Sequence, residues 1–109
     1  MTLVVFDLDG TLLNAQSKIT PYTAETLKLL ERAGVAYTIA TGRTLQGARG
    51  PLDTHRFALP HIVKNGAVIW CPDQEDYSHR HLLTPEEVWP VLGAFSIHDL
   101  TPFIFTLEE

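Results

Sequence analysis

Apolar and polar positions follow a regular order along the first half of the chain. A continuous apolar run covers residues 3–6, and a largely apolar run at residues 35–40 predicts a second buried strand. An unbroken apolar run is typical of a strand buried on both faces. Between these two runs, apolar residues recur three apart from Ala24 to Ala33, which predicts a helix with one apolar side. This order of strand, helix and strand indicates a parallel crossover in an α/β fold.

The ends of the predicted helices are marked by residues with known positional preferences. Thr20 can cap the first helix and Pro21 suits its first position, while Gly34 supplies a left-handed stop after its last residue. A second, short helix is predicted over residues 44–49, because a Gly-Pro pair follows and ends it.

A β-hairpin is predicted next. Asn65 and Gly66 separate a strand expected over residues 62–64 from an apolar run at residues 67–70. Asn-Gly between two such runs is the strongest short hairpin signal. Residues 73–76 are then expected to form a polar loop.

The last third of the chain is predicted to contain a helix followed by a strand. Residues 84–87 form a capping box that predicts a helix up to about residue 95. We expect a kink at Pro90, because proline cannot complete the hydrogen bonding of a helix interior. The apolar run at residues 103–107 predicts a final strand, for which the sequence offers no partner downstream.

Composition excludes several classes of protein. With 109 residues, 45% hydrophobic and 19% charged, the chain is predicted to fold as one globular domain or part of one. Its net charge is -5 and its eight basic residues are spread along the chain, which disfavours a nucleic-acid partner. No apolar run approaches the ~20 residues of a membrane span, and no secretory signal opens the chain. We therefore expect a soluble cytoplasmic protein, which the single cysteine, Cys71, also fits.

Two carboxylates directly follow the first predicted strand, in the run Asp-Leu-Asp-Gly-Thr at residues 7–11. Ligands of an open parallel sheet bind beyond the carboxyl ends of its strands, so Asp7 and Asp9 are expected to face one site. At ~4 Å their repulsion would be about 4 kcal/mol with an effective dielectric constant of about 20. Magnesium, a hard dication that takes oxygen ligands, would offset this repulsion.

These residue types suit phosphoryl transfer. A carboxylate that attacks a phosphate monoester must approach another anion, and a bound metal ion reduces that repulsion. One aspartate would form a covalent phosphoryl intermediate, while the other would give a proton to the leaving oxygen and later take one from water. The alternative interpretation is that Asp9 and Gly10 form a surface turn and that Asp7 merely ends the strand.

A second group of candidate site residues ends the next predicted strand, in the run Thr41-Gly42-Arg43. A hydroxyl group and a glycine amide at the start of a helix form an anion site. The alternative is an ordinary turn from strand to helix. Because this run lies one crossover after Asp7, we expect it at the same edge of the sheet.

The sequence resembles the haloacid dehalogenase superfamily of phosphohydrolases. The first motif of that superfamily is an apolar strand followed by Asp-x-Asp-Gly-Thr, as at residues 7–11, and its second motif is a Thr or Ser at the end of the next strand, as at Thr41. Within the superfamily, the sequence is most similar to the Cof-type branch, which includes sugar-phosphate phosphatases. Residues 7–13, 41–43 and 65–67 match the runs of that branch.

The resemblance implies a role for each matched residue. Asp7 would be the nucleophile and Asp9 the general acid and base. Asp7 and the backbone carbonyl of Asp9 would bind Mg²⁺. The amide of Leu8, together with Thr41 and Gly42, would bind the phosphate.

Arg43 and Asn65 are the two candidates for binding the rest of the substrate. Arg43 is interpreted either as a substrate ligand or as the partner of a surface acid. Asn65 is expected either to line the site or to serve only as a turn residue.

The implied fold is one half of a doubly wound, Rossmann-like parallel sheet over residues 1–75, with the start of an α/β cap over residues 76–109. The superfamily also has a lysine and an acidic pair after the cap. No lysine follows Lys64, and Asp99 lacks the glycine and the second aspartate of the acidic motif. The chain is therefore expected to be an N-terminal fragment with little or no activity alone, and its unpaired strand at residues 103–107 would favour self-association.

The expected function is magnesium-dependent hydrolysis of a small phosphorylated metabolite, such as a sugar phosphate, through an aspartyl-phosphate. Two alternatives stay open: a non-catalytic module that binds phosphate, magnesium or a protein partner, and a phosphomutase on the same scaffold. A receiver domain is disfavoured, because its phosphorylated aspartate lies on a later strand. A zinc site built from Cys71 and the five histidines is also disfavoured, because their spacing matches no common zinc pattern.

Overall fold

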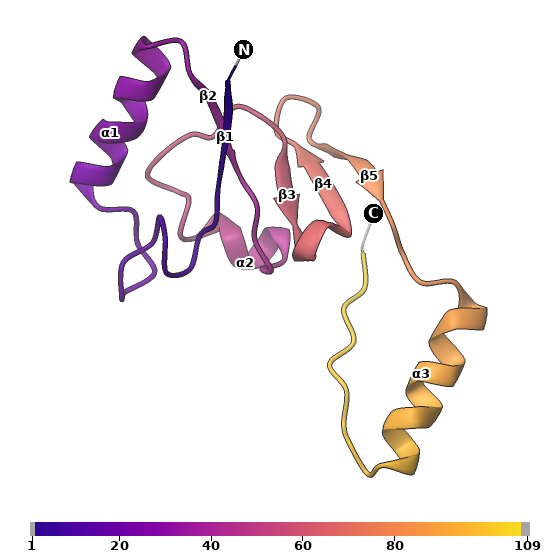
Figure 1. Cartoon of the computed structure of the whole chain (residues 1–109). Coiled ribbons are helices and arrows are strands. Elements are labelled where there is room, and N and C mark those ends of the chain that lie inside the picture. The colour runs from indigo at the N-terminus through magenta and orange to yellow at the C-terminus, as the bar shows by residue number, and fades with distance from the viewer. Residues whose placement is uncertain (1, 108–109) are drawn as a thin grey trace.

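The computed structural model describes residues 2–107. Helices and strands alternate in the first half of the chain and form a mixed α/β fold, as predicted (Figure 1). The elements are β1 (Leu3–Phe6), α1 (Pro21–Arg32), β2 (Ala36–Ile39), α2 (Leu45–Arg49), β3 (His61–Val63), the short helical turn η1 (Lys64–Gly66), β4 (Val68–Cys71), β5 (Asp76–Arg80) and α3 (Pro85–Ile97).

The strands lie side by side in chain order. β1 and β2 pair in parallel, starting with Leu3 opposite Ala36, and α1 connects them. An isolated parallel bridge between Ala40 and Ile62 joins β2 to β3. β3, β4 and β5 then pair antiparallel. The predicted parallel crossover and the predicted hairpin are both confirmed.

The predicted helix starts are also confirmed. The side chain of Thr20 caps α1 by accepting a hydrogen bond of 3.2 Å from the amide of Thr23. Gly34, with a φ of 74°, follows the end of this helix in the left-handed conformation. Thr44 caps α2 in the same way, accepting from the amide of Gly47 at 3.0 Å. Each cap pairs an amide that the first turn of a helix otherwise leaves unpaired.

One face of β1 is exposed, which the apolar run did not predict. Leu3 and Val5 are exposed, whereas Val4 and Phe6 pack against the core. Within residues 2–107, β1 pairs along one edge only, with β2. The prediction of a strand buried on both faces is therefore wrong for this part of the chain. An apolar run indicates that side chains favour a core, but not whether another element covers them.

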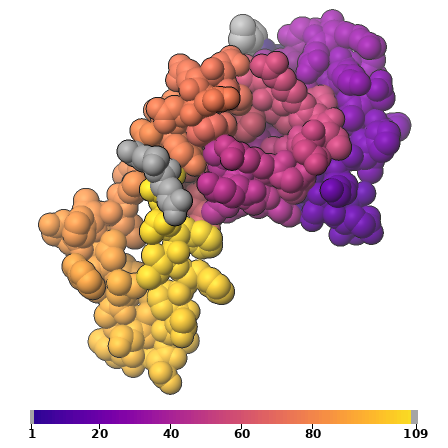
Figure 2. Space-filling model, turned by 180° about the vertical axis from the view of Figure 1, so that it is seen from behind, coloured from indigo at the N-terminus to yellow at the C-terminus, as the bar shows by residue number. Residues whose placement is uncertain are grey.

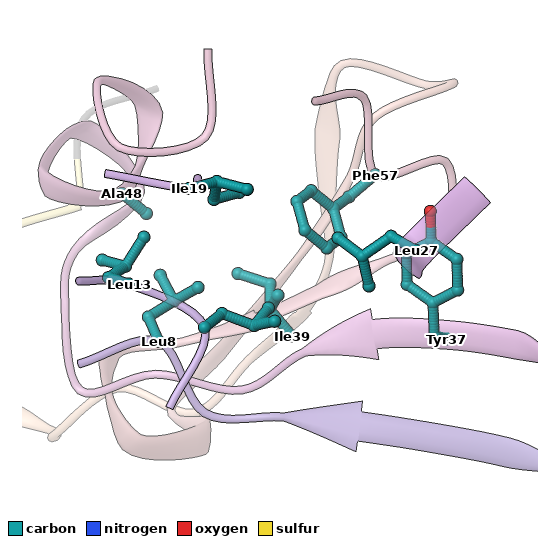
Figure 3. Packing of buried hydrophobic residues seen from close by; sticks show 9 residues of the cluster. Leu8, Leu13, Ile19, Leu27, Tyr37, Ile39, Ala48 and Phe57 are labelled. Atoms are coloured by element: carbon teal, nitrogen blue, oxygen red, sulfur yellow. The ribbon is translucent and has the colours of Figure 1, made fainter. Parts of the chain in front are cut away.

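The hydrophobic core joins α1 and α2 to the β1–β2 pair (Figure 3). Leu8, Leu13 and Ala48 gather near the carboxyl ends of these strands, and Leu27 and Tyr37 lie toward the opposite end. Burial of a leucine contributes about 1.5–3 kcal/mol relative to its exposure. The complete burial of Leu8 therefore fixes the loop that follows β1.

The β3–β4 connection is longer than a two-residue hairpin turn. Val63 pairs with Val68, so residues 64–67 form the connection. Lys64, Asn65 and Gly66 all adopt left-handed backbone, with φ values of 48°, 56° and 88°. Glycine and asparagine tolerate this conformation better than other residues, which explains why Asn-Gly marked the turn correctly.

The strand β5 was not predicted from the sequence. It pairs with β4, so the segment that follows the predicted loop at residues 73–76 is a strand. Its run Asp-Tyr-Ser-His-Arg is mostly exposed and lacks the apolar alternation that signals a strand. The division into a core over residues 1–75 and a cap over residues 76–109 stays a prediction, although β5 belongs to the same sheet as β3 and β4.

α3 extends away from the sheet, and the segment after it returns toward the sheet, as Figures 1 and 2 show from opposite sides. Nζ of Lys64 lies 3.4 Å from the ring centroid of Phe105. The capping box is present, because Thr84 and Glu87 exchange hydrogen bonds of 3.3 and 2.9 Å. The helix is continuous through Pro90, and none of its residues is buried. Within residues 2–107, neither α3 nor any other helix is long and apolar enough to cross a bilayer.

The predicted strand at residues 103–107 is wrong. The structure assigns no strand to this segment, and Phe103, Ile104 and Phe105 are exposed. An apolar run supplies β-propensity, but a strand also needs a neighbouring edge to pair with. Self-association stays a prediction, and it no longer has an unpaired strand as its basis.

Candidate active site

The loop after β1 presents two carboxylates at the carboxyl end of the β1–β2 pair. Leu8 is buried, and Asp7 and Asp9 on either side of it are exposed. The amides of Thr11 and Leu13 donate to the carbonyl of Leu8 at 3.2 and 2.9 Å, which closes a tight turn around this residue. Both acids therefore lie where the sequence predicted them, directly beyond the first strand.

Asp7 keeps one carboxylate oxygen free. Its Oδ1 accepts a hydrogen bond of 2.8 Å from the amide of Leu8. Its Oδ2 has no hydrogen-bond or ion-pair partner among the residues that the structure describes. The Leu8 amide, predicted as a phosphate ligand, is thus engaged with Asp7 itself. Oδ2 is the oxygen that is available for nucleophilic attack.

The pairing of β1 with β2 brings Thr41 to the same edge as Asp7. The amide of Ala40 donates to the carbonyl of Phe6 at 2.8 Å, which extends the pairing to the residue before Asp7. The next amide, that of Thr41, donates to the carbonyl of Ile62 at 2.9 Å and so ties this run to β3. Backbone hydrogen bonds therefore bring the ends of three strands together.

Four of the seven predicted site residues line one hollow of about 310 Å³. These are Asp7, Thr41, Gly42 and Asn65, and the lining is completed by Ala40, Ile62 and Gly66. Thr41 is buried, and its Oγ1 accepts a hydrogen bond of 3.1 Å from the amide of Arg43. The hollow thus brings Asp7 together with Thr41 and Gly42, which lie in the loop that leads to the Thr44 cap of α2.

Asp9 does not line this hollow, and Arg43 holds its side chain. The Nε of Arg43 donates to Oδ2 of Asp9 at 2.8 Å, and Nη2 donates to Oδ1 at 2.7 Å. This two-point contact matches the planar geometry of guanidinium and carboxylate. Of the two interpretations of Arg43, the structure therefore shows the pairing with an acid, and that acid is the predicted proton donor. A role of Arg43 in substrate binding stays a prediction.

Arg43 also controls the charge of Asp9. Its hydrogen bonds are the largest cause that lowers the pKa of the Asp9 carboxyl below the ordinary value of 3.8. Asp9 in turn raises the pKa of Arg43. A carboxylate held in its ionised form can accept a proton but has none to donate. While this pair is intact, Asp9 is therefore better suited to act as a base than as an acid.

Two further contacts of Arg43 were not predicted. Its Nη1 donates to the carbonyl of Gly47 at 2.9 Å, and its Nη2 donates to Oγ of Ser17 at 3.3 Å. Neither partner belongs to a motif. The sequence carried no signal for them, because the contact with Ser17 joins residues that only the fold brings together.

Oxygen donors suited to magnesium are present but few. The free Oδ2 of Asp7 and the backbone carbonyl of Asp9 are hard ligands of the kind that Mg²⁺ prefers. In the part of the chain that the structure describes, no group of three or more His, Cys, Asp or Glu side chains is arranged to hold a metal ion. Magnesium keeps several waters and often takes only one or two carboxylates. The residues described therefore supply two oxygen donors of the kind that magnesium takes, without a cluster of acidic side chains around them.

Similar proteins are known for nearly the whole length of the chain. Residues 4–109 match the sequence profile of the haloacid dehalogenase-like hydrolases. The chain belongs to this family. Phosphatase YwpJ of Bacillus subtilis (strain 168) is 32% identical over 80 residues, which are 73% of this chain and 28% of YwpJ. The 5-amino-6-(5-phospho-D-ribitylamino)uracil phosphatase YitU of the same organism is 29% identical over 102 residues, 90% of this chain and 38% of YitU.

Solved structures of haloacid dehalogenase-like hydrolases have the same fold. One from B. subtilis has a TM-score of 0.77 at 25% identity and covers 91% of this chain, which corresponds to 34% of that protein. A subclass IIB sugar phosphatase of the superfamily has a TM-score of 0.67 at 25% identity, over 91% of this chain and 38% of that protein. The resemblance inferred from the motifs is confirmed. The chain spans about a third of the length of the relatives that it matches.

Proposed function

We propose that the protein represented by this chain hydrolyses a small phosphomonoester with Asp7 as its nucleophile. The observation that carries this proposal is the position of Asp7, which has a free carboxylate oxygen and lines one hollow with Thr41 and Gly42. Relatives and a structural neighbour that are named as phosphatases support the activity.

The proposed reaction passes through an aspartyl-phosphate. Oδ2 of Asp7 attacks phosphorus, and the ester oxygen leaves with a proton from Asp9. Asp9 can carry that proton only after its contact with Arg43 has opened. A water that has given its proton to Asp9 then releases the phosphate and restores Asp7. The hydroxyl of Thr41 and the amides of Leu8 and Gly42 hold the phosphate oxygens. Before the amide of Leu8 can donate to a phosphate oxygen, its hydrogen bond to Oδ1 of Asp7 must break.

Magnesium is the cofactor that we propose. Held by the carboxylate of Asp7 and the backbone carbonyl of Asp9, it would reduce the repulsion between the nucleophile and the phosphate. Within residues 2–107, no group of three or more His, Cys, Asp or Glu side chains adds to these two ligands. We therefore expect this chain alone to bind magnesium weakly and to have little or no activity.

A sugar phosphate is the substrate class that we propose. One structural neighbour is named a sugar phosphatase, and the name of YitU specifies a phosphate on a ribityl chain. We also propose a cytoplasmic location. It is supported by Cys71, the only cysteine of the sequence, whose thiol is free as expected in a reducing compartment.

A non-catalytic module that binds phosphate or magnesium is the second candidate. It is favoured by one observation, the Arg43–Asp9 pair, which engages the carboxyl group that catalysis would need. Such a module would bind inorganic phosphate in the presence of Mg²⁺ but would release none from a phosphomonoester.

The test is phosphate release from p-nitrophenyl phosphate and glucose 6-phosphate by the full-length protein. We expect Asp7→Asn to reduce turnover to background while its thermal unfolding stays unchanged. Asp53→Asn, the same substitution at an exposed loop residue outside the hollow, should retain activity. Normal turnover by Asp7→Asn, or by the native protein in excess chelator, would contradict the proposal.

A further inference from the structure

The side chain of Asn65 lines the hollow beside Asp7 without serving the turn in which it stands. An asparagine in a left-handed turn ordinarily uses its side chain to hydrogen bond the nearby backbone. Asn65 has a φ of 56°, yet its carboxamide hydrogen bonds to no residue within 2–107. The turn therefore explains the backbone conformation of Asn65 but not the placement of its side chain.

Two backbone hydrogen bonds fix the position of Asn65 relative to the hollow. Its amide donates to the carbonyl of Thr41 at 3.0 Å, and the amide of Lys64 donates to the carbonyl of Arg43 at 2.8 Å. The turn is thus fastened to the loop that carries Thr41. The backbone that carries the Asn65 side chain is therefore held beside the residues proposed to bind phosphate.

Gly42 provides the space that this carboxamide occupies. A β-carbon built at position 42 would lie 2.9 Å from Oδ1 of Asn65 and 3.6 Å from its Nδ2. The backbone of Gly42 lies outside the left-handed region, so its conformation does not require glycine. A side chain at this position would therefore displace the carboxamide of Asn65.

We propose that Asn65 binds the phosphate group and that Gly42 orients it, so that Nδ2 donates a hydrogen bond to a phosphate oxygen held against Asp7. This inference rests on the proposed function and adds a donor to it. An amide group suits the place, because it donates a hydrogen bond but carries no charge. It can therefore hold an anion without forming an ion pair with the carboxylate of Asp7.

Two single variants separate this role from that of a turn residue. Asn65→Gly removes the carboxamide and keeps a residue that accepts a φ of 56°. Gly42→Ala introduces a methyl group where Oδ1 now lies, and it displaces the carboxamide at little cost because an exposed side chain can rotate away. Gly50→Ala is the matched control, since a β-carbon at position 50 meets no atom within 4 Å.

The probe is inorganic phosphate, titrated with MgCl₂ present into the ¹⁵N-labelled chain and followed by NMR. We expect the side-chain amide signals of Asn65 to shift on saturation. Asn65→Gly and Gly42→Ala should each weaken phosphate binding about tenfold, as expected for loss of one hydrogen bond to an anion. The double variant should bind no more weakly than either single variant. Gly50→Ala should bind as the native chain does, with unfolding temperatures within a few degrees of each other.

Three results would overturn this inference. They are unchanged phosphate affinity in Asn65→Gly, additive losses in the double variant, and side-chain amide signals that do not move. Asp7→Ala in the same titration separates the two proposals. If Asp7→Ala changes phosphate affinity and Asn65→Gly does not, Asn65 is a turn residue only and the proposed function stands. If the native chain shows no saturable phosphate binding, the inference about Asn65 fails, whereas the proposed function is judged by the phosphate-release assay.

Discussion

Arg43 binds both carboxylate oxygens of Asp9, at 2.8 and 2.7 Å, although 34 residues separate the two in the sequence. The same guanidinium donates to the carbonyl of Gly47 in α2. One side chain thus fastens the loop after β1 to the first helix after β2. It also keeps Asp9 ionised, because each of its hydrogen bonds is made to the charged form of the carboxyl.

Removal of this guanidinium should raise the pKa of Asp9. In Arg43→Gln, we expect the pKa of the Asp9 carboxyl to move up toward its ordinary value of 3.8. Arg43→Lys keeps the charge but loses the two-point contact, so it should give a smaller rise. A ¹³C NMR titration of the carboxyl groups measures this directly. Arg32→Gln, at the end of α1, is the control. If Arg43→Gln leaves the pKa of Asp9 unchanged, the pair does not form in solution.

Two leucines of α1 test the position of the core. Leu27 is 1% exposed and Leu29 is 58% exposed. Leu27→Ala should lower the free energy of unfolding by about 2–5 kcal/mol, because it leaves a cavity. Leu29→Ala should change it by no more than about 0.5 kcal/mol. Urea unfolding of the two variants decides the matter, and equal losses would mean that the helix packs by a different face.

Local signals explain why the first half of the fold could be predicted. Thr20 marked the start of α1 because a cap is a contact between close neighbours in the sequence. The run at residues 7–11 marked the candidate site because an acidic residue directly after an apolar strand must lie at the edge of the sheet. Both kinds of signal are complete within a few residues.

Contacts between distant residues explain what was missed. The sequence shows that Arg43 can bind an acid, but not that Asp9 is the acid it reaches. β5 forms because β4 offers an edge to its polar residues, and residues 103–107 form no strand despite their apolar run. In each case, the outcome depends on a contact with a residue or strand that is distant in the sequence, which the local sequence does not specify.

The apolar side chains of α3 and the segment after it predict self-association of this chain. Trp89 and Phe103 are 71% and 91% exposed. The chain exposes 7809 Å² in total, against roughly 6,000 Å² for a compact monomer of its mass. Sedimentation velocity should therefore detect concentration-dependent dimers, because burial of this surface is favourable.

Charged substitutions locate the contact. Trp89→Asp combined with Phe103→Asp should keep the chain monomeric. Tyr22→Asp is the control, because Tyr22 is 84% exposed but lies on α1. A native chain that stays monomeric up to high concentration would contradict this prediction.

A chain of hydrogen bonds links the exposed Glu31 to the buried Tyr37 and His55 at the end of the core away from the candidate site. The hydroxyl of Tyr37 donates to Oε1 of Glu31 at 2.5 Å and lies 2.6 Å from Nε2 of His55. A tyrosine hydroxyl has only one proton to donate, so Nε2 of His55 must be the donor to Tyr37. His55 is therefore held with its proton on Nε2.

Protonation of His55 should make stability depend on pH. Burial is the main cause that lowers the pKa of His55 below its ordinary value of 6.5, and the nearby charge of Glu31 offsets this only in part. As pH falls below 6.5, the unfolded chain takes up this proton before the folded chain does. Stability should then fall with falling pH, by at most about 1.4 kcal/mol per pH unit for each proton, and should not depend on this group above that range. Burial also lowers the pKa of His61, which adds to the same trend.

Urea unfolding between pH 5 and 7.5 measures the contribution of His55. Glutamine in His55→Gln can still donate a hydrogen bond to Tyr37 but does not titrate. The free energy of unfolding of this variant should therefore fall less steeply toward pH 5 than that of the native chain. The remaining slope is due to His61 and the carboxyl groups. His79→Gln, in the exposed strand β5, should retain the native slope. If His55→Gln and the native chain lose stability in parallel, His55 has the same pKa in the folded and unfolded chains, and the prediction is wrong.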